Sequence, residues 1–169
     1  MSAPPDVRVD RARGRDALPV LGLYRDVLAE GRWFATALAE SSLTLEALEE
    51  RFRDPSQGWF VARTGHQLLG WASLTPGSLA STRHVAALEL MVAADARGRG
   101  VGRALVGAAL GWAAATPALE KVVLAVLADN ERAMRLYRDA GFAEEGRRVA
   151  QYRLGGVWRD DVLMARPAR

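Results

Sequence analysis

The sequence predicts a mixed α/β (α+β) fold, with a mostly antiparallel, twisted sheet and helices on both of its faces. Three strand-like runs follow one another between residues 59 and 92 with only short turns between them, which is typical of antiparallel strands. Strand-like and helix-like segments then alternate from residue 85 to residue 140, which favours a parallel pair of strands. Because the chain has 169 residues, we expect a single domain over residues 1–169, with a flexible tail at residues 1–5.

The first half of the chain contains two predicted helices and four predicted strands. Residues 7–11 alternate apolar and polar side chains, as a half-buried strand does, whereas apolar residues recur at helical spacing from residue 16 to residue 30. A second helix begins after Thr44 and ends at Asp54, because a residue that precedes proline avoids helical backbone angles. The other strand-like segments are residues 59–63, 68–74 and 85–92, with turns at residues 64–67 and 75–78.

The second half of the chain alternates predicted helices with predicted strands. A helix covers residues 100–115, and a continuous apolar run at residues 121–127 predicts a strand that is covered on both faces. The helix at residues 130–140 ends at Gly141, a residue type that suits the end of a helix. Two final strands are predicted, at residues 147–154 and 161–165.

The composition excludes several classes of site. The chain has no cysteine, which excludes a disulfide framework, a thiolate nucleophile and any cysteine-bound metal. It has two histidines, and no cluster of metal-ligating residues surrounds either, so we expect no metal site. The net charge is +3, but the basic residues are scattered along the chain, so we expect no nucleic-acid partner. We see neither an apolar run of membrane-spanning length nor a signal segment, and we therefore expect a cytoplasmic protein without a membrane partner.

The segment from Arg97 to Arg103 places three glycines between a predicted strand and a predicted helix. Because they lack a Cβ atom, Gly98, Gly100 and Gly102 let backbone N–H groups approach an anion closely. The helix that follows adds unpaired N–H donors and the positive end of its dipole, and this combination predicts a pyrophosphate site. The alternative is a tight turn that binds nothing. No Gly-Lys-Ser/Thr follows and the glycine spacing differs from the dinucleotide pattern, which disfavours both kinds of nucleotide-binding loop.

Two motifs in the second half of the chain resemble the GNAT superfamily of acyl-CoA N-acyltransferases. The first is a loop that follows the strand end Leu90-Met91-Val92 and reads Arg97-x-x-Gly100-x-Gly102. The second is similar to the superfamily's Asn-x-x-Ala-x-x-Leu-Tyr-x-x-x-Gly-Phe helix and reads Asn130-x-x-Ala133-x-x-Leu136-Tyr137-x-x-x-Gly141-Phe142. The resemblance covers residues 86–142 most closely. It continues more weakly to Met164, and this last part is similar to spermidine-type N-acetyltransferases.

The resemblance implies a central parallel pair of strands that splay around acetyl-CoA, the co-substrate. It also implies that the backbone of Met91 and Val92 pairs with the pantetheine arm as an added strand would. Independently, a splayed strand frees an N–H group to bind the thioester oxygen as charge develops on it. For Asn130 the alternative is a helix N-cap, and for Arg132 a solvated helix charge. The expected co-substrate ligands are Met91, Val92, Arg97, Gly98, Arg99, Gly100, Val101, Gly102, Arg103, Asn130 and Arg132.

Two residues are candidates for proton transfer. Tyr137 matches the family's general acid, which protonates the departing thiolate, although its place on an apolar helix stripe also fits packing in the core. Glu89 is the one carboxylate in an apolar strand, where burial would raise its pKa and help it to accept a proton from the acceptor amine. The alternatives for Glu89 are a solvent-facing position or a pair with an arginine. His84 is a second candidate base.

The sequence therefore predicts an enzyme that transfers an acetyl group from acetyl-CoA to a primary amine of a small molecule, by direct attack of the amine on the thioester. Two alternatives stay open: a protein or peptide N-terminal acetyltransferase, and a CoA-binding module without catalysis. Neither the acceptor nor the length of the acyl group is determined. Trp33 and Phe34 follow the first helix, where an aromatic wall would hold an alkyl amine or a cation. We expect a homodimer, in which a partner covers the C-terminal edge of the sheet.

Overall fold

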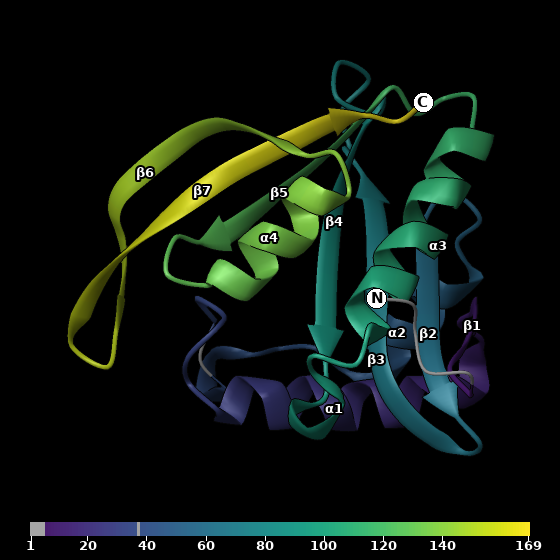
Figure 1. The fold of residues 1–169 in the computed structure, drawn as a ribbon. Coiled ribbons are helices and arrows are strands. Elements are labelled where there is room, and N and C mark those ends of the chain that lie inside the picture. The colour runs from purple at the N-terminus through teal and green to yellow at the C-terminus, as the bar shows by residue number, and fades with distance from the viewer. Residues whose placement is uncertain (1–5, 37) are drawn as a thin grey trace.

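The computed structural model describes residues 6–36 and 38–169, which form one mixed sheet of seven strands with helices on both faces (Figure 1). The strand order is β1-β2-β3-β4-β5-β7-β6. Neighbouring strands are antiparallel except for β4 and β5, which are parallel. The predicted mixed, mostly antiparallel α/β fold is therefore confirmed. The flexible tail predicted at residues 1–5 lies outside the described residues.

The strands and helices occur in the order that the sequence predicts. The strands are β1 (Arg8–Arg11), β2 (Gly58–Thr64), β3 (Gln67–Pro76), β4 (Val85–Val92), β5 (Lys121–Leu127), β6 (Ala143–Leu154) and β7 (Val157–Pro167). The α-helices are α1 (Ala17–Ala29), α2 (Leu45–Arg53), α3 (Val101–Ala115) and α4 (Glu131–Asp139), and short 3₁₀ turns lie at Gly14–Asp16, Leu38–Glu40 and Ala94–Ala96. None of the helices described here is long and apolar enough to cross a membrane.

The parallel strands β4 and β5 pair along only part of their length. Residues 85–87 of β4 pair with residues 121–123 of β5. Beyond these pairs, β4 stays bonded to β3 as far as Val92, and β5 stays bonded to β7 as far as Leu127. The two strands therefore separate inside the sheet while each keeps an antiparallel neighbour. This splayed parallel pair is the geometry that the resemblance implied.

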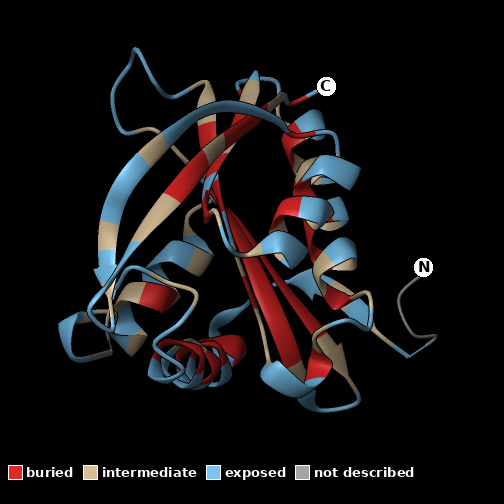
Figure 2. Cartoon of the chain, turned by 60° about the vertical axis from the view of Figure 1, so that its left-hand side comes forward, coloured by how far each residue is buried: buried red, intermediate tan, exposed pale blue. Residues whose placement is uncertain are grey.

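Each face of the sheet buries its own apolar cluster beneath helices (Figure 2). On one face, α1 and α2 cover Trp59, Trp71 and Met91. On the other face, Leu105 of α3 and Tyr137 of α4 pack among apolar residues of β2, β3, β4, β5 and β7. The alternation of side chains along the strands divides the apolar residues between the two clusters, because successive residues of a strand point to opposite faces.

The expectation that residues 121–127 form a strand covered on both faces is wrong. Val122, Leu124 and Val126 are buried against α3 and α4, but Ala125 points to the other face and is exposed. The helices on that face, α1 and α2, pack on β2, β3 and β4 rather than on β5. The apolar run therefore lines an open part of the molecule, and periodicity cannot distinguish such a strand from a fully buried one.

The last two strands are longer than the sequence predicts. The prediction covered residues 147–154 and 161–165, whereas β6 begins at Ala143 and β7 at Val157. The pattern was not visible because β6 is an edge strand that is exposed along most of its length, so its side chains show little alternation. The two glycines that join the strands have φ values of 55° and 82°, which glycine adopts without strain.

The packing of α3 against the sheet gives a test of the fold. Leu105 is fully buried, so Leu105→Ala is expected to lower the free energy of unfolding by about 2–5 kcal/mol, because it leaves a cavity in the core. The matched control is Leu18→Ala in α1, where the side chain is 68% exposed and a change within about 0.5 kcal/mol is expected. Urea denaturation followed by circular dichroism measures both variants. Equal losses in the two variants would contradict the described burial.

Candidate active site

The separation of β4 from β5 leaves one edge of β4 without a neighbouring strand. Met91 packs in the core beneath α1 and α2, and Val92 packs against the core on the opposite face. Both residues pair with β3, but in an antiparallel ladder only alternate residues direct their backbone groups to a given neighbour. The remaining N–H and C=O groups face the separation. An extended molecule that carries amide groups can bind such an edge as an added strand does.

The glycine loop connects the end of β4 to the start of α3. Gly98 and Gly100 have φ values of 80° and 82°, in the left-handed region that a side chain would strain. Gly100 is the N-cap of α3, so the N–H groups of Val101, Gly102 and Arg103 have no acceptor within the helix. These donors and the positive end of the helix dipole converge on the loop. The arrangement has the geometry of an anion site.

Gly102 differs from the other two glycines, because it lies at a point of close packing. A Cβ atom on this residue would lie 3.1 Å from Leu136 Cδ2 and 3.7 Å from Leu90 Cδ2. The first turn of α3 therefore lies directly against α4 and β4, and a side chain at Gly102 would crowd the end of the Leu136 side chain. The sequence pattern treats the three glycines alike, whereas the structure separates two that turn the backbone from one that allows contact.

Arg97 holds the glycine loop to the end of α1. Its Nη1 and Nη2 atoms donate to the two carboxylate oxygens of Glu30 at 2.7 and 2.6 Å, and its Nε donates to the Val92 carbonyl at 3.0 Å. The two side chains are only 23% and 28% exposed, and a two-pronged pair of this kind fixes their relative orientation. No local signal indicates Glu30, because it lies 67 residues from its partner in the sequence.

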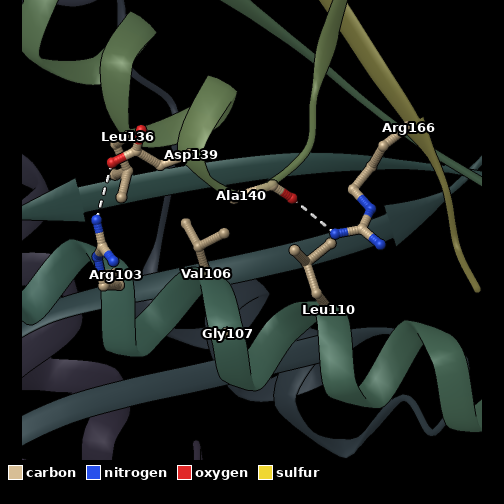
Figure 3. Close-up of a pocket in the computed structure, with 8 residues that line it drawn as sticks. All are labelled: Arg103, Val106, Gly107, Leu110, Leu136, Asp139, Ala140 and Arg166. Atoms are coloured by element: carbon tan, nitrogen blue, oxygen red, sulfur yellow. Dashed lines mark hydrogen bonds and ion pairs between the residues drawn. The ribbon is translucent and has the colours of Figure 1, made fainter. Parts of the chain in front are cut away.

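Arg103 forms an ion pair with a carboxylate beside a small cavity. This cavity, of about 250 Å³, lies between α3 and α4 (Figure 3). At one end Arg103 forms an ion pair of 2.8 Å with Asp139, and at the other Arg166 Nη1 donates to the Ala140 carbonyl at 2.7 Å. The walls between them are mostly apolar and include Val106, Leu110 and Leu136. The charge of Arg103 is thus already balanced within the chain.

Arg99 and Arg132 are the remaining guanidinium groups near the loop. Both are exposed, and in the part of the chain that the structure describes neither has an ion-pair partner. The Nη1 atom of Arg132, on α4, lies 3.5 Å from the position that a Cβ atom of Gly98 would occupy. Asn130 caps the same helix, since its side chain accepts from the Ala133 N–H at 3.2 Å. The N-cap role is confirmed, and contact of Asn130 with a co-substrate stays a prediction.

Tyr137 projects from α4 into the core. It is 7% exposed, and its ring meets that of Phe142 edge-on, with 5.8 Å between the centroids. Burial raises the pKa of Tyr137 far above its usual range, so the phenol keeps its proton at every physiological pH. It packs in the same cluster as Leu88 and Leu124, the first residues of β4 and β5 beyond their last pair. The packing role is confirmed, and the role of proton donor stays a prediction.

Glu89 lies on the opposite face of the sheet, in an open cavity of about 680 Å³. The last paired residues of β4 and β5, Ala87 and Val123, line the same cavity, so it begins where the two strands separate. Water reaches the side chain through the open mouth, yet the walls desolvate the carboxyl group. This burial raises the pKa of Glu89, and the charge of Arg51 acts in the opposite direction. Glu89 thus has the raised pKa that was predicted for a buried carboxyl group, and it also faces solvent, as the alternative proposed.

One buried hydroxyl group beside Glu89 has no hydrogen-bond partner among the described residues. Ser73 pairs directly with Glu89 in the β3–β4 ladder, which places the two side chains side by side on one face, and Ser73 Oγ is buried without a partner. Trp71 Nε1 is buried in the same way. Such atoms are uncommon and mark places where water or a ligand completes the hydrogen bonds. The sequence does not single out Ser73, because only the strand register brings it to Glu89.

Two other residues named from the sequence lie outside this cavity. The His84 carbonyl accepts from the N–H groups of Glu120 and Lys121, and the residue is not part of the cavity wall. Trp33 stacks against its neighbour Arg32, with 4.3 Å between the guanidinium carbon and the ring centroid, and lines neither cavity. Among the described residues of the wall, Glu89 is therefore the one group suited to accept a proton.

The comparison with protein families agrees with this geometry. Residues 25–142 match the acetyltransferase (GNAT) family, and the matched segment includes the glycine loop, the separated strands and α4. The chain belongs to this family, whose members transfer an acetyl group from acetyl-CoA. The resemblance inferred from the two motifs is confirmed.

Individual relatives differ in the acceptor that their names state. Spermidine N(1)-acetyltransferase of Vibrio cholerae is 26% identical over 129 residues, which cover 76% of this chain and 73% of that protein. A solved ribosomal-protein-alanine N-acetyltransferase from Brucella melitensis superposes with a TM-score of 0.83 at 27% identity and covers 95% of this chain and 99% of its own. A solved structure from Salmonella typhimurium with its cofactor acetyl-CoA has a TM-score of 0.88 at 17% identity, over 97% of this chain and 95% of that one, which shows the fold alone.

Proposed function

We propose that this protein transfers an acetyl group from acetyl-CoA to a primary amine of a small molecule. The observation that carries the proposal is the position of the separation between β4 and β5. The glycine loop follows the far end of β4, and the cavity that contains Glu89 begins at the last pair of the two strands, Ala87 and Val123. A thioester held along the free edge of β4 would therefore reach the cavity where an amine can attack it.

The residues around the loop fit the phosphates of acetyl-CoA. In this proposal the pyrophosphate binds the N–H groups of residues 99–102, and the pantetheine arm pairs with the backbone of Met91 and Val92. Arg99 and Arg132 supply positive charge, since no carboxylate among the described residues pairs with either. The side chains of Arg97 and Arg103 act indirectly, because Glu30 and Asp139 already bind them.

Glu89 and Tyr137 are the two titratable groups that transfer protons in the proposed reaction. Glu89 takes a proton from the acceptor ammonium, and the neutral amine attacks the thioester carbon. The new N–C bond forms as the C–S bond breaks, and an N–H group on the free edge of β4 stabilises the oxygen. Tyr137 gives its proton to the thiolate and recovers it through water from the acylated nitrogen. The raised pKa of Tyr137 is compatible with this role because the phenol is fully protonated before the step.

A small acceptor is favoured by the shape and lining of the cavity. It has a volume of about 680 Å³ and a wall formed by α2, β3, β4, β5 and loop residues at 57, 77 and 82. The runner-up, a peptide N-terminus, requires a surface along which a chain can extend away from the amine. A binding module without catalysis would not need Glu89 in the cavity. The expected cytoplasmic location and homodimer remain parts of this proposal, and the exposed edge of β6 is the surface that we expect a second copy to cover.

The first test concerns the glycine loop. Gly100→Leu is expected to weaken acetyl-CoA binding by about 100-fold or more, because a side chain at a left-handed position displaces two N–H donors from the anion. The control is Gly111→Leu, since a Cβ atom there has no heavy atom within 4 Å. Calorimetric titration measures binding, and circular dichroism checks that both variants are folded. Unchanged affinity in folded Gly100→Leu would exclude the loop as the phosphate site.

The second test concerns the proton donor. Tyr137→Phe keeps the ring and its contact with Phe142 but removes the hydroxyl, so kcat is expected to fall by about 10²-fold while acetyl-CoA affinity changes little. Steady-state rates of thiol release over a neutral pH range provide the measurement. Phe142→Leu serves as a control for disturbed packing, with a loss of stability and a smaller change in kcat. A wild-type rate in Tyr137→Phe would assign the residue to packing alone.

The third test concerns the base. If Glu89 accepts the proton, kcat/KM is expected to rise with pH through the raised pKa of its carboxyl group. Glu89→Gln is expected to lose this rise and about 10²-fold or more in rate.

The stability of the fold should change with pH in the opposite direction to the rate. Because the folded protein binds this proton more tightly than the unfolded chain, ionisation destabilises the fold as pH rises from the ordinary value of 4.5 through the folded pKa. Glu89→Gln should therefore unfold at a higher temperature than wild type at pH 7. An unchanged pH–rate profile would remove Glu89 from the mechanism.

A further inference from the structure

Arg51 and Glu89 carry opposite charges into one cavity from two different elements. Arg51 belongs to the last turn of α2 and Glu89 to β4, and both line the cavity of about 680 Å³. Their charges interact, but within residues 6–36 and 38–169 no ion pair or hydrogen bond joins the two side chains. Their charged atoms are therefore more than 4.0 Å apart, which is the limit for an ion pair. Both side chains line the same cavity, so a ligand bound in this cavity can contact both.

Most of the other polar side chains of this cavity are already bonded. Gln57 donates to Asp54 Oδ2 at 2.9 Å and accepts from Trp59 Nε1 at 3.2 Å. Thr82 donates to the Leu79 carbonyl at 3.3 Å. The rest of the wall is small or apolar apart from one threonine, and comprises Thr75, Pro76, Gly77, Val85, Ala87 and Val123. Arg51 and Glu89 are thus the groups of the described wall that can bind a charged ligand.

A buried hydroxyl group next to the acidic end of the cavity has no hydrogen-bond partner among the described residues. Ser73 Oγ lies beside Glu89 on the same face of the sheet and is buried without a partner among the described residues. A buried hydroxyl group without a hydrogen-bond partner destabilises the folded protein. Ser73 lies beneath the wall rather than in it, so it marks a polar environment around the Glu89 carboxyl group. Because Glu89 is the carboxylate of the wall, its end of the cavity suits the amine and the Arg51 end suits an anion.

We propose that the acceptor is an aminocarboxylate with an uncharged side chain, whose carboxylate binds Arg51 while its amine lies at Glu89. The proposal rests on the proposed acetyl transfer and deepens it by naming the substrate class. Arg51 can bind a carboxylate through two parallel N–H donors, which fixes the direction in which the amine points. The apolar part of the wall then receives an uncharged side chain.

The same charges disfavour the other acceptors that the family uses. A polyamine would place a second ammonium group in the cavity that contains Arg51, and like charges within one cavity repel. The N-terminus of a peptide has an amide where a free amino acid has its carboxylate, so it cannot form the Arg51 contact. Arg51 would therefore act in specificity, through an attraction to one class of acceptor and a repulsion toward another.

The test compares matched acceptors with wild-type enzyme and acetyl-CoA, by the rate of thiol release and by mass spectrometry of the product. The panel contains alanine, leucine, methionine and phenylalanine, the amide of each, 3-methylbutylamine and spermidine. At least one amino acid is expected to exceed its own amide in kcat/KM by about 10- to 100-fold, which corresponds to one charge-assisted contact. The amide has the less basic amine, so the fraction of free base cannot produce this preference.

Variants of Arg51 separate its charge from its shape. Arg51→Gln is expected to lower kcat/KM for the preferred amino acid by about 10- to 100-fold, mainly through KM, and to change that for its amide by less than about threefold. Arg51→Lys is expected to restore part of the preference, because it keeps the charge but not the two-pronged contact. The control is Arg53→Gln on the same helix, whose side chain is 70% exposed and pairs with Glu49 rather than lining the cavity.

The outcomes distinguish this inference from the proposed function. Turnover of amines or amides without a preference for the carboxylate overturns the substrate class and leaves acetyl transfer intact. A preference for spermidine, or an equal loss in Arg51→Gln for the amino acid and its amide, has the same meaning. If acetyl-CoA binds but no amine in the panel is acetylated, the proposed function fails, and the inference that rests on it fails as well.

Discussion

The pairing of β4 with β5 ends after residues 87 and 123, and the site depends on this early end. A strand that loses a neighbour normally exposes unpaired backbone groups, which is costly when no water or ligand reaches them. Here each strand keeps an antiparallel neighbour on its other side, so both remain ordered while their facing edges stay free. The fold therefore tolerates a break in the middle of its sheet, and the break supplies backbone donors and acceptors that a ligand with amide groups can use.

The glycine loop and the break in the sheet form one structural unit. The guanidinium group of Arg97 donates hydrogen bonds both to Glu30, at the end of α1, and to the Val92 carbonyl, at the end of β4. Gly102 lets the first turn of α3 lie against both α4 and β4. The position of the anion site relative to the free edge is thus fixed by an ion pair on one side and by apolar contact on the other. Both contacts join elements that are distant in the sequence.

Five arginines lie at the loop or in the acceptor cavity, and they fall into two groups according to whether a carboxylate of the chain binds them. Glu30 and Asp139 neutralise Arg97 and Arg103, which therefore serve to hold elements together. No carboxylate among the described residues is bonded to Arg99 or Arg132 beside the loop, or to Arg51 in the acceptor cavity. A charge that the chain leaves unpaired is the charge available to a ligand. Residue type alone does not separate these groups, because their roles depend on whether an acidic side chain lies within reach.

The sequence by itself determined the strands and helices that have periodic apolar side chains. It also determined the glycine loop and the family. β4 and β5 occupy the residues predicted for them, and α2 begins after Thr44, as its capping side chain indicates. These features are local, since they depend on side-chain period and on single caps or turns. The open face of β5, the full length of β6, the contact of Glu30 with Arg97 and the neighbouring positions of Ser73 and Glu89 were decided only by the tertiary structure. Each depends on strand register or on contact between distant segments, and the local periodicity of a sequence contains no information on either.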